Sequence, residues 1–305
     1  MKVSVILPTY NRSRMISEAI DSVLNQTFKD FELIVVDNYS TDNTESAVQS
    51  YRDKRIRYYK NHNHGLVSVS RNYGIEKSGG EYIAFLDDDD LWLPEKLEKQ
   101  LILLDSNKEL GLVYSDYYNM DSNGNLIGEP CFRSLKPFRG NVFNELIVVN
   151  FVPQLTVLIR REALDVVGGF NLKYRIAQDY DLWLRIAERY LIDFTEEPLA
   201  KYRIHGGNVS GNQRLSISEN IQVVDYWLKK KRDIDRQFRK KAKQEQAIRH
   251  TWLLLYYFRN HENRKTLSSC LNLIKLLPNS LVLIPVGSAK LGRIMCKSTA
   301  KTARV

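Results

Sequence analysis

Four successive aspartates, Asp87–Asp90, directly follow the apolar run YIAFL and are the residues with the clearest potential for chemistry. Adjacent carboxylates repel one another, and an acidic pocket also repels an anionic substrate. Hard divalent cations such as Mg²⁺ and Mn²⁺ bind carboxylate oxygens and often bridge them to substrate phosphates. The pattern therefore predicts a cation site. A single Asp after a strand would instead suggest a solvated helix cap.

A second candidate carboxylate lies in the segment AQDYDLWLRIAERY, residues 177–190. If this segment is a helix, Asp179 shares a face with its apolar stripe, which consists of Leu182, Trp183, Ile186 and Tyr190. Asp181 falls on the opposite, solvent-exposed face of the helix, where an i,i+4 ion pair with Arg185 explains it. A carboxylate on the buried face needs a partner or a purpose. Asp179 is thus a candidate functional acid, the alternative being a helix N-cap.

Alternating strands and helices position these residues. Continuous apolar or β-branched runs predict strands at 3–7, 31–36, 55–59 and 82–86. Helical periodicity or start signals predict helices at 15–26, from about Asp42 with Glu45 in a capping box, at 67–77, and from Pro94 to Asp105. This alternation predicts an α/β fold with a mostly parallel, Rossmann-like sheet flanked by helices.

The first, second and fourth predicted strands all end in polar residues. These endings are Pro8-Thr9-Tyr10, Asp37-Asn38 and Asp87–Asp90. In an open α/β sheet, ligands bind outside the carboxyl ends of the strands. We therefore expect the three endings to share one edge and to form a ligand site.

The sequence also resembles a known family. Five segments carry the resemblance, in this order: VSVILPTYNR, FELIVVDNYSTDNT, VSRNYGIEKSGGEYIAFLDDDDLWLPEKLE, GGFNLKYRIAQDYDLWLRI and PLAKYRIHGGNVS. Together they are similar to the family-two glycosyltransferases, inverting enzymes of the type A fold, over about residues 1–210. The resemblance implies transfer of a sugar from a nucleotide diphosphate sugar, with Mn²⁺ or Mg²⁺ held by an Asp-x-Asp motif.

By this resemblance Asp87 and Asp89 are the metal-binding acids, and Asp88 contacts the ribose or is incidental. The element Arg203-x-His205 resembles one that contacts phosphate or metal, with the alternative that the histidine is structural. Such a metal stabilises negative charge on the departing diphosphate without requiring a proton. The acceptor hydroxyl must lose its proton, which calls for a general base.

The family pattern Glu-Asp-x-Asp assigns the base to its first Asp, here Asp179. This chain has Gln178 in place of the Glu. Arg71 resembles an arginine that contacts the diphosphate or the base of the nucleotide. The alternative is a surface arginine paired with Glu76.

Thr9 and Tyr10 match the start of the nucleotide pocket, and Asp37-Asn38 replaces the usual Asp-Asp pair. Because Asn38 can both donate and accept hydrogen bonds, uracil fits and thymine is no less compatible. A UDP-sugar is the donor we favour.

We divide the chain into a catalytic domain at 1–214 and a basic helical tail at 215–305. Residues 1–104 form the nucleotide and metal half. Residues 105–214 form the acceptor half, with a strand hairpin turning at Asn123-Gly124. Residues 211–305 carry 20 of the 45 Lys and Arg and 6 of the 36 Asp and Glu, a net charge of +14 within a chain of net +9. The rest of the chain is mildly acidic.

Three interpretations of the basic tail remain open. A cluster of Lys and Arg next to apolar helices suits an anionic membrane surface, where LPNSLVLIPVGSAKLGRIMCK at 277–297 would press apolar residues into the interface. One alternative is a solvated face packed on the catalytic domain. The less favoured alternative, suggested by aromatic residues interleaved with Lys and Arg, is nucleic-acid binding. No stretch is long enough for a membrane span, and the N-terminal apolar run is too short for a signal peptide.

Cys131, Cys270 and Cys296 are far apart and lack CxxC spacing, which indicates reduced thiols in a cytoplasmic protein. The basic tail adds the expectation that the protein is peripheral on the cytoplasmic face of the membrane. The family resemblance implies a transferase acting on a glycan or lipid-linked saccharide in surface polysaccharide synthesis. The alternative is a sugar-nucleotide-binding module without transferase activity.

Overall fold

The computed structural model describes residues 1–134, 136–208 and 211–276. Its contacts divide the chain into two compact units, Met1–Glu245 and a second that begins at Gln246.

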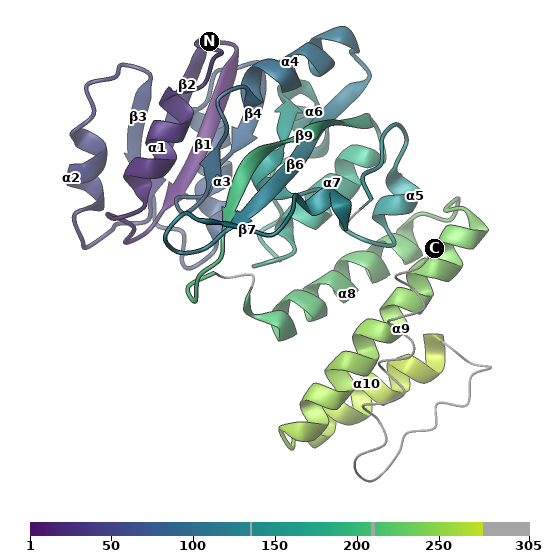
Figure 1. Ribbon diagram of the computed structural model, residues 1–305. Helices are drawn as coiled ribbons and strands as arrows, with labels where there is room; N and C mark the ends of the chain where they lie inside the picture. Colours follow the sequence, from purple (N-terminus) through teal and green to yellow (C-terminus); the bar gives the residue numbers. More distant parts are fainter. Residues whose placement is uncertain (135, 209–210, 277–305) are drawn as a thin grey trace. The chain divides into compact units, whose positions relative to one another are not determined.

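The described strands of the first unit form one nine-stranded sheet in the order β3-β2-β1-β4-β8-β6-β9-β5, with β7 paired to β6. Figure 1 shows β1 between β2 and β4. The strands are β1 (Val3–Thr9), β2 (Phe31–Asp37), β3 (Ile56–Lys60), β4 (Tyr82–Phe85), β5 (Leu91–Trp92), β6 (Leu110–Met120), β7 (Leu126–Ile127), β8 (Leu158–Arg160) and β9 (Leu191–Arg203).

Helices and short 3₁₀ turns connect and cover these strands. The α-helices are α1 (Ile16–Leu24), α2 (Thr44–Gln49), α3 (Val67–Lys77), α4 (Lys96–Ser106), α5 (Phe143–Leu146), α6 (Arg161–Val167), α7 (Gln178–Ala187), α8 (Gln213–Lys230), α9 (Arg236–Arg259) and α10 (Asn263–Leu276). The 3₁₀ turns are η1 (Cys131–Arg133) and η2 (Gln154–Thr156).

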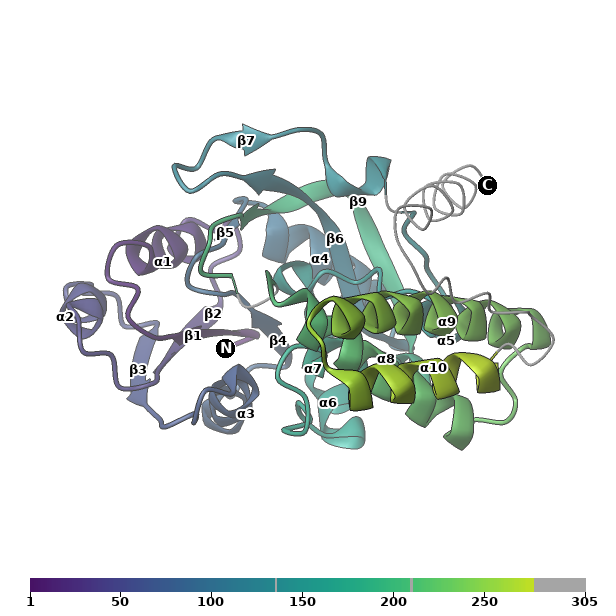
Figure 2. The same ribbon diagram turned by 90° about the horizontal axis from the view of Figure 1, so that it is seen from below.

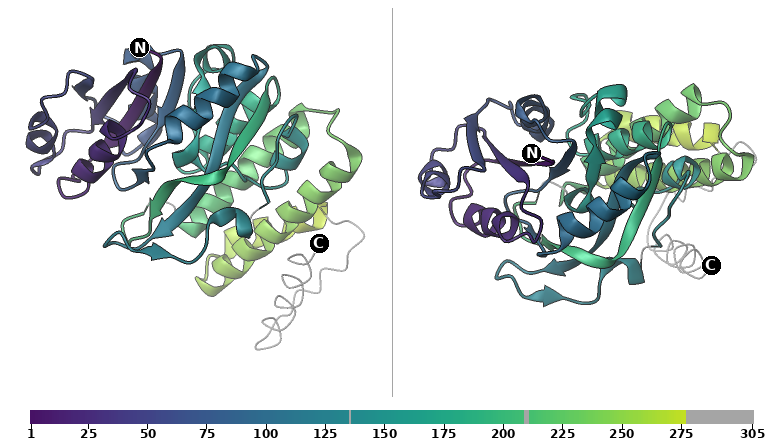
Figure 3. Two further views of the ribbon diagram at one scale, coloured as in Figure 1. Left: turned by 45° about the horizontal axis from the view of Figure 1, so that its top comes forward. Right: turned by 90° about the horizontal axis from the view of Figure 1, so that it is seen from above.

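Two apolar clusters cover the two faces of the sheet. Alternate residues of β1 belong to different clusters: Val5 packs with α1 and α4, whereas Ile6 packs with α5, α6 and α7. Views from below and above agree that α1 and α3 lie on opposite sides of β1 and β2 (Figures 2 and 3). Gly74 lets α3 approach closely, because a Cβ there would lie 2.5 Å from Ile6 Cγ2. The sheet is thus a central layer between two helical layers.

The predicted fold class is confirmed, with the helical extension α8–α10. The four strands nearest the N-terminus pair in parallel, and β1 and β2 are buried along their whole length, which explains their continuous apolar runs. The sheet becomes mixed from β4 onward, where β8 pairs with β4 and β6 in antiparallel fashion. The predicted hairpin after β6 is also present, and Gly124 has φ +88° in its turn.

The start of α2 differs from the expectation. The helix begins at Thr44, and the Asp42 carboxylate accepts hydrogen bonds from the backbone N–H groups of Thr44 and Ser13. Glu45 pairs with Lys60 at 2.6 Å. The capping-box prediction holds only in part: Asp42 accepts the first N–H of the helix, whereas Glu45 pairs with Lys60 at the end of β3 instead of reaching back to Asp42. Similarly, Pro94 precedes α4, which begins at Lys96.

The first unit extends past residue 214, where we placed the end of the catalytic domain. Val223, Val224 and Trp227 of α8 are fully buried in the same cluster as Trp183 of α7. The division between units falls inside α9, after Glu245. The predicted boundary does not coincide with this division, because the apolar face of α8 completes the core beneath α7.

The second unit contains the end of α9 and α10, which pack through Ala247, Leu254 and Leu273. Within the described part of the chain, none of the helices is both long and apolar enough to cross a membrane. Cys131 in the first unit and Cys270 in the second are both free thiols. Cys296 and the segment 277–297 lie outside the described residues.

Candidate active site

A cleft of about 570 Å³ opens at the carboxyl ends of β1, β2 and β4, at the edge of the sheet where the strand-end argument predicts a site. This volume lies in the usual range for small-molecule sites. Seven of the predicted site residues, drawn from four segments, line it: Thr9, Tyr10, Asn38, Arg71, Asp87, Asp88 and Asp89. Asp179 lines it from the start of α7, together with Gln178. The structure therefore brings the two predicted carboxylate groups into one cleft.

Arg71 in α3 holds the first aspartate of the acidic turn, Asp87–Asp90. Its Nη2 lies 2.6 Å from Asp87 Oδ1, and the arginine is buried at 2% exposure. Glu76 pairs with Lys77 instead. The alternative interpretation of Arg71 as a surface partner of Glu76 was therefore wrong, because the helix turns Arg71 inward toward the strand end.

Two further cationic or imidazole groups lie beside the middle of the turn. Arg12, on the loop after β1, places its guanidinium 3.5 Å from Asp88 Oδ1 and 3.7 Å from Asp89 Oδ2. His205 Nε2 lies 2.9 Å from Asp89 Oδ2, and the N–H of Tyr10 donates to Asp88 Oδ2 at 3.3 Å. These groups offset part of the negative charge of the turn.

The charge of the turn is nevertheless incompletely balanced. Burial and the neighbouring Asp89 raise the pKa of Asp88 to about 7. Burial and Asp87 raise the pKa of Asp89, and burial and Asp89 hold the pKa of Asp90 well above its usual range. Each shift has desolvation as its first cause and a like charge as its second. The turn would thus gain from an additional cation.

The carboxylate oxygens of Asp87 and Asp89 suit a divalent ion that also binds a substrate. Within the described ranges, no three His, Cys, Asp or Glu side chains are already grouped to hold a metal ion. Mg²⁺ is usually bound by only one or two carboxylates, with water and substrate phosphates as its remaining ligands. Asp87 and Asp89 supply such oxygens, and His205 contacts Asp89 directly. Two carboxylates in a cleft with room for substrate phosphates satisfy this requirement for a magnesium site.

Asp179 differs from the turn in its surroundings. Burial raises its pKa to about 6, while its carboxylate accepts the N–H of Tyr180 at 2.7 Å and feels the charge of Arg71. A carboxylate of this kind is ionised at neutral pH and still basic enough to take a proton. The position suits a general base.

The predicted wet face of α7 is absent. Asp181 is buried at 4% exposure and forms the expected pair with Arg185, Nε to Oδ2 at 2.9 Å. That assignment of Asp181 to solvent was wrong, because α7 is enclosed on nearly every side by β6, α6 and α8. Tyr190, counted in the apolar stripe, lies beyond the helix and is only half-buried.

Glu219 of α8 fixes the start of α7. Its carboxylate accepts three consecutive backbone N–H groups, from Arg175 at 3.0 Å, Ile176 at 2.7 Å and Ala177 at 3.0 Å. A negative charge at a helix N-terminus satisfies unpaired donors and complements the helix dipole. Glu219 therefore positions Asp179, which is two residues beyond the last of these donors.

Gln178 is buried at 3% exposure and lines the cleft next to Asp179. Its Oε1 is a buried acceptor without a hydrogen-bond partner in the described part of the chain. Buried polar atoms are normally satisfied, so an orphan in a cleft points to a ligand group.

The predicted nucleotide residues separate into two groups. Thr9, Tyr10 and Asn38 line the cleft, and the Asn38 side-chain oxygen accepts the N–H of Asn63 at 2.9 Å. Asp37 is fully buried behind it and accepts from Ser40 N–H at 2.9 Å and from Tyr58 O–H. The Asp37 carboxylate thus fixes the loop that carries Asn38.

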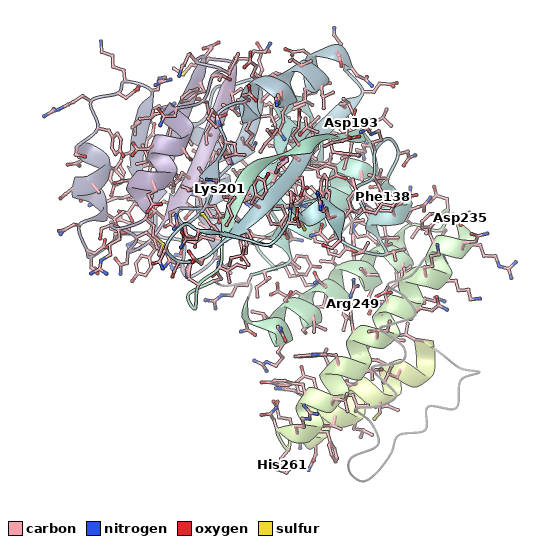
Figure 4. The ribbon with its side chains drawn as sticks, viewed as in Figure 1. Phe138, Asp193, Lys201, Asp235, Arg249 and His261 are labelled. Carbon is pink, nitrogen blue, oxygen red and sulfur yellow. The ribbon has the colours of Figure 1, made fainter. Side chains whose placement is uncertain are left out.

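Arg203 likewise lies behind the cleft lining. Figure 4 labels Lys201 near the end of β9, two residues before Arg203. The guanidinium donates to the Asp89 carbonyl at 2.8 Å and to Glu18 at 2.7 Å, and the backbone N–H donates to Asp90 Oδ1 at 2.9 Å. The contacts with Asp89 and Asp90 hold the acidic turn in place.

Sequence reasoning missed Arg12 and Glu219. Arg12 ends the quoted segment VSVILPTYNR, so its position directly after a strand end was an available signal. Glu219 lies in the region we assigned to the tail, and no local pattern marks it. Their roles depend on contacts between residues that are distant in the sequence. Arg12 contacts aspartates 76 or more positions away, and Glu219 contacts residues 42 to 44 positions away.

The sheet order and the cleft at its edge place the protein in the class of the type A glycosyltransferase fold. The family model "Glycosyl transferase family 2" matches residues 4–168, more than half of the chain. The chain belongs to glycosyl transferase family 2.

Relatives agree with this assignment. An uncharacterized glycosyltransferase of Methanocaldococcus jannaschii is 38% identical over 240 residues, covering 75% of this chain and 80% of that protein. The Escherichia coli UDP-Glc:alpha-D-GlcNAc-diphosphoundecaprenol beta-1,3-glucosyltransferase WfgD is 32% identical over 224 residues, 73% of this chain and 85% of WfgD. The matched part spans only about a third, 32% to 36%, of three longer Rickettsia glycosyltransferases.

Solved structures share the fold. Staphylococcus aureus TarS gives a TM-score of 0.70 at 21% identity, covering 92% of this chain and 50% of that chain. A TarS 1–349 structure in complex with UDP-GlcNAc gives 0.61 at 19% identity, with 90% of each chain covered. A Pyrobaculum calidifontis mannosyltransferase in complex with GDP-Man and Mn²⁺ gives 0.65 at 17% identity, covering 99% of this chain and 80% of that chain.

Proposed function

We propose that this protein transfers a sugar, with inversion, from a UDP-sugar to a hydroxyl of a glycan or lipid-linked saccharide. The observation that carries the proposal is the convergence of Asp87, Asp89 and Asp179 in one cleft at the carboxyl ends of β1, β2 and β4. Family membership agrees with it. WfgD uses UDP-Glc and a diphosphoundecaprenol acceptor, which supports a role in surface polysaccharide synthesis.

The donor occupies the part of the cleft formed by the ends of β1, β2 and β4. Thr9, Tyr10 and Asn38 contact the base, and Asn38 offers an amide N–H donor to a ring carbonyl. Arg71 and Asp88 lie at the ribose and diphosphate, where Arg71 already carries a strong charge-assisted bond. Asp37 and Arg203 act indirectly, by holding the Asn38 loop and the acidic turn.

Asp87 and Asp89, with His205, would hold Mn²⁺ or Mg²⁺. When bound, the ion stabilises the charge that develops on the leaving diphosphate. The mannosyltransferase with the same fold was solved in complex with GDP-Man and Mn²⁺.

Asp179 takes the proton of the acceptor hydroxyl. The acceptor oxygen then forms a bond to the anomeric carbon, while the bond from that carbon to the diphosphate oxygen breaks with its electron pair. Attack from the opposite face inverts the anomeric centre. Another hydroxyl of the acceptor saccharide donates a hydrogen bond to Gln178, which would satisfy its buried Oε1.

The direct test measures UDP release from UDP-sugars with Mn²⁺, for the natural protein and for Asp89→Asn. We expect release only with the natural protein and only with Mn²⁺. Equal release from both proteins would remove the metal assignment. A thermal-shift panel of nucleoside diphosphates with Mn²⁺ identifies the base, and stabilisation by GDP but not UDP would contradict our choice of donor.

A binding module without transferase activity is a second candidate, favoured by Gln178 where the family usually has Glu. It predicts UDP-sugar binding without release of UDP in the presence of any acceptor. Product analysis with diphosphoundecaprenol-linked saccharides separates the two functions.

We also infer that the end of α9 and α10 contact anionic lipid. Phe258, Leu267 and Leu271 expose 50% to 62% of their surface there, and Arg259 and Arg264 lie in the same segment. Exposed apolar residues combined with cations fit a membrane interface.

Flotation with vesicles containing phosphatidylglycerol tests this inference. We expect the double variant Leu267→Glu/Leu271→Glu to lose most vesicle binding while its melting temperature is retained, since both residues are exposed. Unchanged flotation would contradict a lipid contact. The matched control, Val166→Glu on the exposed surface of α6, should float like the natural protein.

A further inference from the structure

Arg12 is held at the acidic turn more loosely than the other arginines near it. Its guanidinium lies 3.5 Å from Asp88 Oδ1 and 3.7 Å from Asp89 Oδ2, beyond ordinary hydrogen-bond length. Arg71, in contrast, contacts Asp87 at 2.6 Å, and the Arg203 guanidinium donates to a carbonyl and a carboxylate. Arg12 therefore contributes charge to the turn without being bonded into it.

The backbone that carries Arg12 is, in contrast, firmly fixed. Asn11 has φ +52°, a left-handed conformation that Asn tolerates better than most residues. The N–H groups of Asn11, Arg12 and Ser13 donate to side chains of the 40–44 loop at 2.9, 3.0 and 3.1 Å. A fixed backbone thus directs a weakly held side chain toward the turn.

Arg12 also has space to leave that position. Its side chain is 28% exposed and lines the cleft beside Gly207, where an added Cβ would lie 3.6 Å from Nη1. Gly207 has no side chain and therefore leaves room beside the guanidinium.

We propose that Arg12 is an internal counter-ion of the acidic turn that gives up its place to the divalent ion and then contacts the donor diphosphate. This inference rests on the proposed function. Without nucleotide, Arg12 and the metal compete for the charge of Asp89, which lies 3.7 Å from Arg12 and is one of the proposed metal ligands. With nucleotide, the phosphates supply the negative charge that Arg12 loses, and a planar guanidinium matches phosphate oxygens well.

The proposal requires effects of opposite sign from one substitution. Arg12→Gln should bind Mn²⁺ alone about tenfold more tightly, because a nearby positive charge no longer opposes the ion. The same variant should bind UDP about tenfold more weakly at saturating Mn²⁺, because a charge-assisted contact is lost.

The experiment uses the full chain in two titrations. Electron paramagnetic resonance of free Mn²⁺ measures metal binding without nucleotide, and calorimetry measures UDP binding at saturating Mn²⁺. Arg14→Gln is the matched control, since it removes the same charge from an exposed arginine two residues away and should leave both affinities unchanged. Arg12→Lys keeps the charge, so it should bind Mn²⁺ as the natural protein does while still losing UDP affinity.

Each outcome decides the matter. Equal Mn²⁺ affinities for the natural protein and Arg12→Gln overturn the proposal, as does tighter Mn²⁺ binding by Arg12→Lys. Loss of both ligands in Arg12→Gln, with melting unchanged, makes Arg12 a fixed part of the metal site and also overturns it. A natural protein that binds neither Mn²⁺ nor any nucleoside diphosphate contradicts the proposed function itself. Failure of the inference alone leaves natural binding of both intact.

Discussion

The acidic turn and the start of α7 both present carboxylates to the same cleft, but they are partnered in opposite ways. Arg71, Arg12 and His205 lie within 3.7 Å of aspartates 87 to 89. Asp179 has no ion pair within 4.0 Å in the described ranges, and backbone donors fixed by Glu219 surround its helix start. The first arrangement suits holding charge and the second suits moving a proton.

The largest expected effect comes from the proton-transfer side. Asp179→Asn should lower kcat by about 10³-fold, within the usual range for a lost general base. UDP binding with Mn²⁺ should be unchanged. Kinetics with calorimetry checks this split, and a loss of UDP affinity equal to the loss of kcat would place Asp179 with the charge-holding group.

The charge-holding side should give the reverse pattern. Asp89→Asn should abolish the effect of Mn²⁺ on UDP affinity and lower kcat/KM by about 10²-fold. Titrating UDP with and without Mn²⁺ measures the coupling. A variant that still gains UDP affinity from Mn²⁺ would contradict the assignment of Asp89.

The pH dependence of the reaction follows from Asp179. Because the pKa of Asp179 is raised to about 6, its carboxylate is ionised above that pH and protonated below it. A base must be ionised, so kcat should fall about tenfold per pH unit below about 6. A profile that is flat to pH 5, measured where thermal melting shows a folded protein, would argue against Asp179 as the base.

Glu219 should affect catalysis through position alone. Glu219→Ala leaves three backbone donors without their acceptor and should cost about 1–3 kcal/mol of unfolding free energy. We expect kcat to fall about tenfold with KM for the donor unchanged. Glu219→Gln keeps an acceptor oxygen and should recover part of both losses, whereas no recovery would indicate a role for its charge.

The smallest expected effect is a gain in stability. Burial and Asp89 raise the pKa of Asp88 to about 7, so ionised Asp88 destabilises the folded protein at pH 8. Asp88→Asn without metal should therefore melt about 2–4 °C higher at pH 8, if about 1 kcal/mol is regained. The gain should shrink as the pH falls through about 7, and a gain that persists at pH 5 would point to a packing effect instead.

The N-terminal half was predictable because its signals are local. Each strand from β1 to β4 is a short apolar run, and the parallel order places the ends of β1, β2 and β4 together. Asp179 was found by its position relative to Trp183 in a helical stripe. These features need only a few neighbouring residues.

The rest depended on packing between distant segments. Asp181 was placed in solvent because the pattern of a single helix does not show that distant segments pack around it and bury it. Arg203 was matched to a phosphate contact, but the pairing of β9 turns its guanidinium toward Asp89 and Glu18. The family resemblance located the motif acids, while the supports behind them became visible only in three dimensions.

The carboxylate of Glu219 reaches from α8 to the beginning of α7, so the position of Asp179 depends on a residue outside the segments that carry the family resemblance. The family match ends at residue 168, fifty-one positions before Glu219. Chimeras that exchange C-terminal segments between relatives would therefore need to exchange α7 and α8 together. A chimera that exchanges α8 alone should lose the three hydrogen bonds that fix the start of α7.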